Sequence, residues 1–305
     1  ELRSQRDEPL RFEDTPMRIS KILLPVDFSE RSVAAAHYVH ALAMPFHSEV
    51  IMVHVVRPLD YAMGGAELTG AVGSEWYATR LEDWRGQLNK FQVKEFENLP
   101  VRRVVLEGNP AAEIVALAKQ ESCDLIVMPT HGYGPFRRFL IGSVTATVLH
   151  DSDCPVFTGT HLVEKPAPER LVVRRLLCAV DFGPQSEVML RWASDFAEDY
   201  GASLHVVHAL PALSSGEARY LDEEFQVSIA RQAREQAGKL LARVRLDSDV
   251  IMEHGDPARV VHDAAKTVGA DIVVIGRHVS TGILGRLRTH AYAIVRESPV
   301  PVISI

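Results

Sequence analysis

Short apolar runs alternate along this chain with longer stretches in which apolar residues recur every three or four positions. Residues 125–128 and 272–275 are apolar throughout, as expected of strands buried on both faces of a parallel sheet. Residues 32–43 and 111–119 have a helical period, with Ser29 and Asn109-Pro110 as their predicted N-terminal caps. This alternation predicts an α/β fold with doubly wound, open, mostly parallel sheets of the Rossmann-like kind.

Two longer helices are also predicted, one in each half of the chain. Residues 76–96 place Trp76, Trp84 and Phe91 near one stripe, and residues 225–241 carry an apolar residue at every fourth position. Stripes of this kind usually pack on the core, so we assign them no ligand.

The second half of the chain repeats the first. Five blocks recur in the same order: 21–28 with 175–182, 50–56 with 204–210, 108–112 with 255–259, 123–128 with 270–275, and 154–157 with 298–301. The offset shrinks from 154 to 147 to 144 residues, which indicates trimmed loops between kept elements. The repeat predicts two tandem five-stranded domains, 17–160 and 171–305, joined by a Pro-rich and charged linker at 161–170.

Charge and composition exclude several classes of partner. The net charge is −7 and the basic residues are scattered, which argues against nucleic acid as a partner. No apolar run approaches the length of a membrane span, so no membrane partner is expected. The three cysteines lack metal-ligand spacing and indicate reduced thiols in a cytoplasmic protein. His37 and His40 lie three apart on a predicted helix with no carboxylate nearby in the sequence, so no metal site is predicted.

One segment joins the end of a strand to the start of a helix. Residues 126–132 form a predicted buried strand and tight turn, and Gly142-Ser143 opens a helix after a loop. The unpaired N–H groups and positive dipole end of a helix N-terminus favour phosphate. Gly132 would let the backbone approach a ribose or phosphate closely. Arg137 and Arg138 in the loop either reach terminal phosphates or are solvated surface charges.

These residues carry a resemblance to a known family. Residues 25–29 (Pro-Val-Asp-Phe-Ser), 53–55 (Val-His-Val), 108–110 (Gly-Asn-Pro) and the 130–144 segment resemble motifs of the universal stress protein family, over both halves of the chain. The resemblance implies an adenine nucleotide alpha-hydrolase-like fold. It also implies that the first domain binds ATP, with or without Mg²⁺, or a related adenine nucleotide.

The resemblance also implies which residues bind the nucleotide. Pro25, Val26 and Asp27 would border the base, and Val55 would contact adenine through its backbone. The remaining residues of the implied site are Met128, Thr130, His131, Gly132, Arg138, Gly142, Ser143, Val144 and Thr145. Asp27 has a second interpretation as a turn residue, because its counterpart Asp181 is kept in the second half. No catalytic residue is assigned, and at most slow ATP hydrolysis is expected.

The chain departs from the family signature at a few positions. The nucleotide-binding branch has Gly, two residues, Gly, nine residues and then Gly-Ser or Gly-Thr, whereas here Pro129 replaces the first glycine. Proline lacks the N–H and adds bulk, which predicts weakened binding. The second half has Val279 and Thr289-His290 at the other signature positions. If these positions need a left-handed backbone, a β-branched residue costs at least roughly 1–2 kcal/mol. We expect the second half to bind ATP weakly or not at all.

Each half ends in an apolar strand that follows a proline, at residues 155–158 and 301–305. Members of the family pair such strands across a dimer, so the two domains are predicted to pair within one chain, and a homodimer of whole chains stays an option. The leading hypothesis is an ATP-binding stress-response module. The alternatives are a protein-interaction scaffold whose two sites are both relics, and a true ATPase or adenylating enzyme.

Overall fold

The computed structural model describes residues 18–57, 71–130, 141–159, 172–211, 223–277 and 286–305. The strands of the first domain are β1 (Lys21–Pro25), β2 (Glu49–Val56), β3 (Val101–Glu107), β4 (Leu125–Val127) and β5 (Val156–Thr158). Its helices are α1 (Glu30–Ala43), the 3₁₀ turn η1 (Met44–Phe46), α3 (Ala71–Lys90), α4 (Pro110–Gln120) and α5 (Ser143–Asp151).

The second domain repeats this order. Its strands are β6 (Arg175–Ala179), β7 (Ser203–Leu210), β8 (Val250–His254), β9 (Ile272–Ile275) and β10 (Val302–Ser304). Its helices are α6 (Ser186–Tyr200), α7 (Glu223–Val244), α8 (Pro257–Val268) and α9 (Arg286–Glu297). Within the described ranges, no helix has the length and apolar character needed to cross a membrane.

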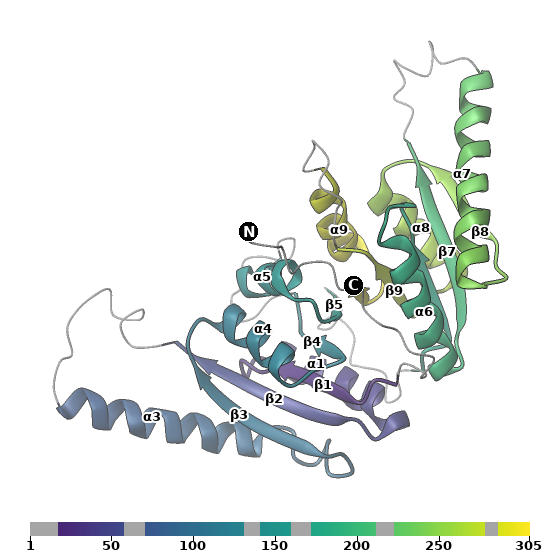
Figure 1. Ribbon diagram of the computed structural model, residues 1–305. Helices are drawn as coiled ribbons and strands as arrows, with labels where there is room; N and C mark the ends of the chain where they lie inside the picture. The colour runs from purple at the N-terminus through teal and green to yellow at the C-terminus, as the bar shows by residue number, and fades with distance from the viewer. Residues whose placement is uncertain (1–17, 58–70, 131–140, 160–171, 212–222, 278–285) are drawn as a thin grey trace, which may run out of the picture.

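All described strands belong to one continuous sheet, in the order β3-β2-β1-β4-β5-β10-β9-β6-β7-β8. Neighbours within each domain are parallel, and the two domains meet where β5 and β10 pair antiparallel, with Phe157 opposite Ile303 (Figure 1). The predicted α/β fold with two mostly parallel five-stranded halves is confirmed. The predicted pairing of the terminal strands within one chain is present, and it removes the edge that each half would otherwise expose.

Side-chain caps start the helices where the sequence predicts them. The Ser29 side chain accepts a hydrogen bond from the N–H of Ser32 at the start of α1. Asn109 caps α4 with Pro110 at the first helical position, and Asp256 caps α8 in the same way. These caps satisfy N–H groups that a helix start leaves without partners. The predicted caps Ser29 and Asn109 are therefore confirmed.

Gly108, just before the α4 cap, occupies a position that excludes a side chain. Its φ is +150°, and a Cβ there would lie 2.5 Å from Oε1 of Glu113. Its N–H continues the sheet by donating to the carbonyl of Val56 at 3.0 Å. The Gly-Asn-Pro motif thus turns the chain sharply from β3 into α4.

Two predicted boundaries are corrected. The helix expected over 76–96 ends at Lys90, and Gln92 has a left-handed φ of 49°, which a continuing α-helix cannot contain.

The alignment of the fifth repeat block is also wrong, by two residues. Pro155 and Pro301 both accept the sheet hydrogen bond of the neighbouring strand, from Ile126 and Val273 respectively, so they are the true counterparts. The last offset is therefore 146 residues.

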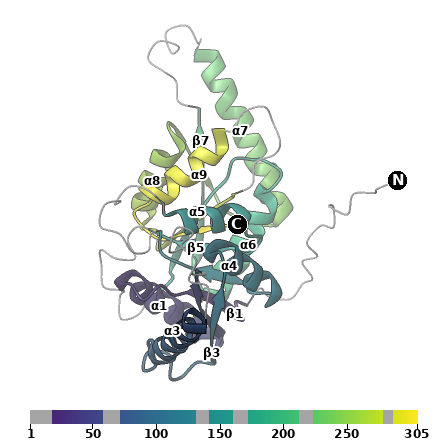
Figure 2. The same cartoon turned by 90° about the vertical axis from the view of Figure 1, so that its left-hand side faces the viewer.

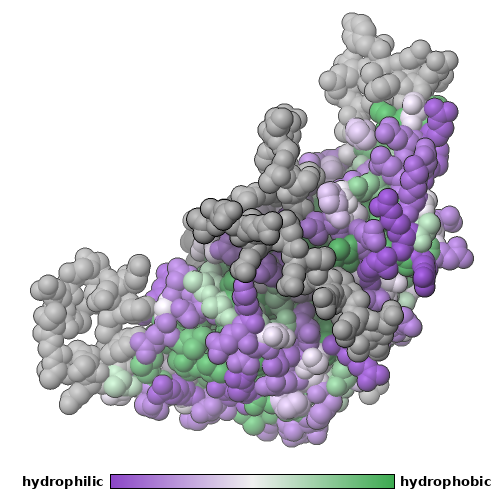
Figure 3. All heavy atoms as spheres, in the orientation of Figure 1, coloured by the Kyte–Doolittle hydropathy of each residue, from purple (hydrophilic) through white to green (hydrophobic). Residues whose placement is uncertain are grey.

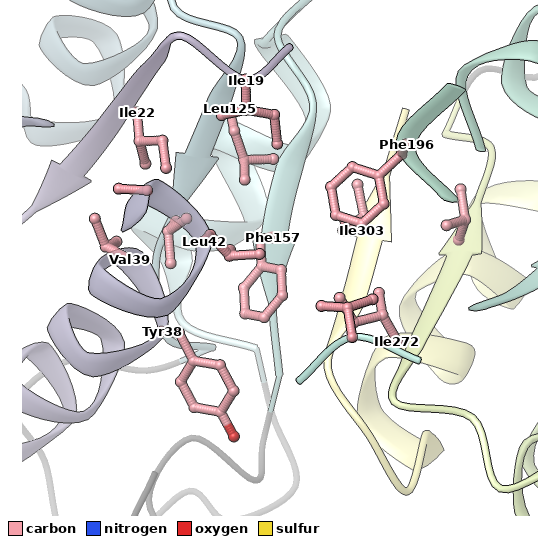
Figure 4. Close-up of a cluster of buried hydrophobic side chains, with 14 of the residues drawn as sticks. Ile19, Ile22, Tyr38, Val39, Leu42, Leu125, Phe157, Phe196, Ile272 and Ile303 are labelled. Carbon is pink, nitrogen blue, oxygen red and sulfur yellow. The ribbon is translucent and has the colours of Figure 1, made fainter. Parts of the chain in front are cut away.

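The two domains share one core. A buried cluster beneath α1, α3, α6 and α7 runs through both halves of the sheet. Phe157 and Ile303 belong to this cluster, each with no exposed surface, and Phe196 of α6 lies beside Ile303 (Figure 4). The opposite face carries a separate cluster in each domain, one under α4 and α5 and the other under α8 and α9. On the outside, the visible face of α7 is mostly hydrophilic (Figure 3).

Candidate functional site

A cavity of about 190 Å³ lies at the carboxyl ends of β1, β2 and β4 and at the N-termini of α4 and α5. The strand order reverses between β1 and β4, because the chain runs outward through β2 and β3 and then returns to β4. Open α/β sheets bind ligands at such a switch point. The cavity is lined by Pro25, Val26, Asp27, Ser32, Val53, His54, Val55, Pro110, Ile114, Met128, Pro129, Val144 and Thr145.

The cavity brings together seven of the predicted site residues: Pro25, Val26, Asp27, Val55, Met128, Val144 and Thr145. Gly142 and Ser143 directly precede this lining as the N-cap and first residue of α5. Thr130 is not part of the lining. It is 4% exposed, and its hydroxyl lies 3.5 Å from the carbonyl of Gly159. His131, Gly132 and Arg138 lie outside the described residues.

Asp27 holds the turn that leads from β1 into α1. Its Oδ1 accepts hydrogen bonds from the Ser29 N–H at 3.0 Å and the Ser29 hydroxyl at 2.6 Å, and also from the Ser32 hydroxyl. Phe28, between them, has a left-handed φ of 63°, a strained conformation for a bulky residue. Asp181 and Phe182 form the same turn in the second domain. The interpretation of Asp27 as a turn residue is confirmed.

His54 of β2 stands at the wall of the cavity. Its Nδ1 lies 2.7 Å from the carbonyl of Val26, which makes Nδ1 the protonated nitrogen. Burial lowers the pKa of His54, against the smaller opposing effects of the Val26 carbonyl and Asp27. The ring packs against Phe28 and Trp84, with centroids 4.7 and 4.8 Å away. His54 is therefore a neutral, fixed wall residue rather than a free base.

The start of α5 is tied to the end of β4. The Gly142 N–H donates to the Thr130 carbonyl at 2.7 Å, and the Thr145 hydroxyl donates to the Pro129 carbonyl at 3.0 Å. The Gly142 N–H is thus already engaged, contrary to the expectation that it would offer itself to phosphate. The N-cap residue Gly142 has no side chain, so it makes no capping bond to the N–H groups at the first three helical positions, Ser143, Val144 and Thr145.

The backbone at Gly142 is not left-handed, so this signature position does not need a glycine for its conformation. Its φ is −61°, an ordinary value for any residue. A β-branched residue at this position, as at Thr289 in the second half, therefore carries no left-handed strain. Only the bulk of such a side chain at the helix start can interfere with a ligand.

Some lining residues were not assigned from the sequence. Pro110 belongs to the 108–110 motif, His54 to the 53–55 motif, and Pro129 was recognised only as a departure. Ser32 lies three residues after its cap Ser29, which is the helical spacing that would have placed it, and Ile114 lies four residues after Pro110 of the same lining.

The second domain has a cavity of about 230 Å³ in the equivalent place. Asp181, His208, Gly276, Arg277 and His290 are among its lining residues. His290, at the position of Ser143, is one of the residues that border this cavity. The equivalent of the first site thus persists as a cavity with a different polar lining.

His37 and His40 do have a carboxylate neighbour, contrary to the sequence-based expectation. Oε1 of Glu95 lies 3.0 Å from Nδ1 of His37 and 3.7 Å from Nδ1 of His40. Among the residues that the structure describes, no group of three or more His, Cys, Asp or Glu side chains could hold a metal ion. The three side chains therefore link α1 to the turn after α3.

Comparisons with known proteins agree with this architecture. The model of the universal stress protein family matches residues 18–158 and again 173–305. The universal stress protein MJ0531 of Methanocaldococcus jannaschii is 33% identical over 153 residues, covering 49% of this chain and 84% of its own. Rv2005c of Mycobacterium tuberculosis, also a universal stress protein, is 26% identical over 305 residues, covering 94% of this chain and 97% of its own.

The crystal structure of a universal stress protein from Archaeoglobus fulgidus covers 94% of this chain and 98% of its own chain. Its TM-score is 0.67 at 22% identity, which shows a shared fold. Because the family model matches both halves and together nearly the whole sequence, the chain belongs to the universal stress protein family, with two domains of that family in tandem.

Proposed function

We propose that the first domain binds ATP or a related adenine nucleotide, and that binding regulates a stress response by changing conformation or partner choice. The observation that carries this proposal is the cavity at the switch point between β1 and β4. Seven of the residues implied by the family line it, and the start of α5, without a side-chain cap, lies at its edge. An apolar slot beside a helix N-terminus suits a base joined to phosphates.

The same geometry favours weak binding. Pro129 lines the cavity and has no N–H to offer a ligand. Mg²⁺, when bound, would neutralise phosphate charge, and no described side chain is assigned to hold it. No pair of carboxylates or activated nucleophile has been identified at the described part of the site, so we assign no catalytic residue.

A pair of cavity-filling variants tests which domain binds. Val144 lines the first cavity and its repeat counterpart Ala291 lines the second. We expect Val144→Trp to raise the ATP dissociation constant roughly tenfold or more, and Ala291→Trp to leave it within about twofold. Isothermal titration of both variants, with thermal unfolding as a check of folding, makes the comparison.

A universal stress protein has been solved in complex with cAMP, so the titration includes cAMP beside ATP. Equal ATP affinity in the wild type and Val144→Trp would remove the first cavity as the site. If neither nucleotide shifts the unfolding temperature of the wild type in the presence of Mg²⁺, the scaffold hypothesis replaces this one. Linear ADP release that Val144→Trp abolishes would instead identify an enzyme.

A further inference from the structure

Two side chains of the second domain hold α5, the helix whose start borders the first cavity. The Tyr292 hydroxyl of α9 donates to the carbonyl of Ala146 at 3.0 Å. The Arg277 guanidinium, which follows β9, donates to the carbonyls of Leu149 at 3.4 Å and Cys154 at 2.7 Å. Two views of the molecule show α9 beside α5 (Figures 1 and 2).

Arg277 is placed to fix the C-terminal end of α5. The carbonyl of Leu149 is among the last ones of this helix, which an α-helix leaves without an intrahelical donor. A cation there also complements the negative end of the helix dipole. Burial lowers the pKa of Arg277 to about 10, so the guanidinium stays charged at neutral pH.

The N-terminal end of α5 is enclosed by both domains. Ile141, the residue before the N-cap, packs against the buried cluster of the first domain and also against that of the second. Tyr292 packs against the first-domain cluster although it belongs to the second domain. Helix α5 is therefore seated between the domains rather than on its own domain alone.

The two side chains occupy the repeat positions of two residues that the family resemblance assigns to the first site. With the offset of 147 residues, Arg277 stands at the position of Thr130 and Tyr292 at the position of Thr145. In the first domain, Thr130 and Thr145 bond to carbonyls of their own domain, at Gly159 and Pro129. In the second domain, the larger side chains at these positions reach across to α5. Residues at the altered site of the second domain thus bond to helix α5 of the first domain and to the residues that follow it.

We infer that the second domain positions the phosphate-binding helix of the first, with Arg277 and Tyr292 as positioning residues for nucleotide binding. This inference rests on the proposed function for its readout. In the proposed binding mode the N–H groups at the start of α5 bind the phosphates, so loss of either contact should weaken the binding of ATP more than that of adenosine. A general loss of stability would not change the ratio of the ATP and adenosine dissociation constants.

Matched tyrosine variants test the inference. Tyr292→Phe removes one hydroxyl that bonds to α5, whereas Tyr200→Phe removes one that bonds across the domains to the carbonyl of Leu42 in α1, at 2.8 Å. We expect Tyr292→Phe to raise the ATP dissociation constant about two- to fivefold and Arg277→Met about five- to tenfold, with adenosine affected less than twofold. Tyr200→Phe should leave both ligands unchanged, and Arg277→Lys should recover part of the ATP affinity.

Hydrogen exchange of α5 provides a readout that needs no ligand. In the unliganded protein, Arg277→Met should speed exchange of the α5 amides relative to those of α4, and Tyr200→Phe should not. Unchanged α5 exchange, or an equal loss of ATP and adenosine affinity, overturns the inference. If the wild type binds neither ligand, the proposed function fails, and the exchange result alone decides whether the second domain positions α5.

Discussion

Asp27 and Asp181 hold equivalent turns at the start of the two domains. In each turn, one carboxylate oxygen accepts bonds from a backbone N–H and a serine hydroxyl, and the phenylalanine that follows has a positive φ. The aspartate is therefore needed for the turn in both domains, whether or not a nucleotide binds. In the first domain, Phe28 also directs its ring onto His54 and Trp84, which fixes one wall of the cavity.

At the residue scale, His54 predicts a pH dependence of stability. Its folded-state pKa is lowered from the ordinary value of 6.5, mainly by burial. As pH falls below about 6.5, the unfolded chain therefore takes up a proton that the folded state resists, and stability declines. His54→Asn keeps a donor for the Val26 carbonyl but cannot titrate, so its stability should decline less between pH 7.5 and pH 5.5.

Urea unfolding of both proteins at several pH values measures this difference. The wild-type and variant curves should run parallel above pH 7 and diverge below pH 6.5. Curves that stay parallel down to pH 5.5 would show that His54 titrates alike in the folded and unfolded states.

At the scale of elements, the two helices that border the first cavity begin differently. Asn109 caps α4 with its side chain, whereas α5 begins at Gly142, which has no side chain to do so. The N-cap residue of α5 therefore makes no side-chain bond to the N–H groups that follow it. Helix α5 itself is held by Thr145 near its start and by Arg277 at its end, so its position depends on both domains.

The caps of α4 and α8 form a matched pair for mutation. Asn109→Ala and Asp256→Ala each remove two hydrogen bonds to helix-start N–H groups, and each should lower the free energy of unfolding by about 0.5–2 kcal/mol. Only Asn109→Ala should also weaken ATP binding, because Pro110 of α4 lines the first cavity. Urea unfolding and nucleotide titration of both variants give the comparison. A loss of ATP affinity in Asp256→Ala alone would place the site in the second domain.

At the scale of the whole molecule, the two domains form one structural unit. The sheet is continuous through the β5–β10 pair, and the core beneath α1, α3, α6 and α7 crosses that junction without a break. Gly159, at the end of β5, permits this close approach, since a Cβ there would lie 3.2 Å from Cα of Pro301. The pairing covers the edge strand of each domain within one chain.

Phe157→Ala tests whether the domains are stable only together. Phe157 is fully buried at the junction, so its truncation should lower the free energy of unfolding by about 3–5 kcal/mol. Because the core is shared, hydrogen exchange should rise in β1 of the first domain and in β9 of the second alike. Faster exchange confined to the first domain would mean that the two halves unfold independently.

The sequence by itself determined the elements, their order and their duplication. Apolar runs buried on both faces, caps such as Ser29 and Asn109, and the glycine before α4 act over a few residues, so their signals are local. The seven site residues that line the first cavity were assigned from the family resemblance and not from these local signals. They lie together because the carboxyl ends of neighbouring parallel strands meet at one edge of a sheet. The pattern predicts that helix α3 continues beyond residue 90, which is wrong, because a periodic pattern does not reveal the left-handed turn at Gln92.

Only the tertiary structure decided what depends on contacts between distant segments. In the structure the Thr130 hydroxyl lies at the Gly159 carbonyl, and the Gly142 N–H is bonded to the Thr130 carbonyl. Glu95 contacts His37, and both Arg277 and Tyr292 bond to carbonyls of the first domain at or near α5. None of these contacts has a local signal, because each joins residues from separate elements whose meeting depends on sheet order and packing. For the same reason, the sequence repeat shows only that the residues of the second site differ from those of the first. The contacts of Arg277 and Tyr292 show that these residues bond to helix α5 and the residues after it.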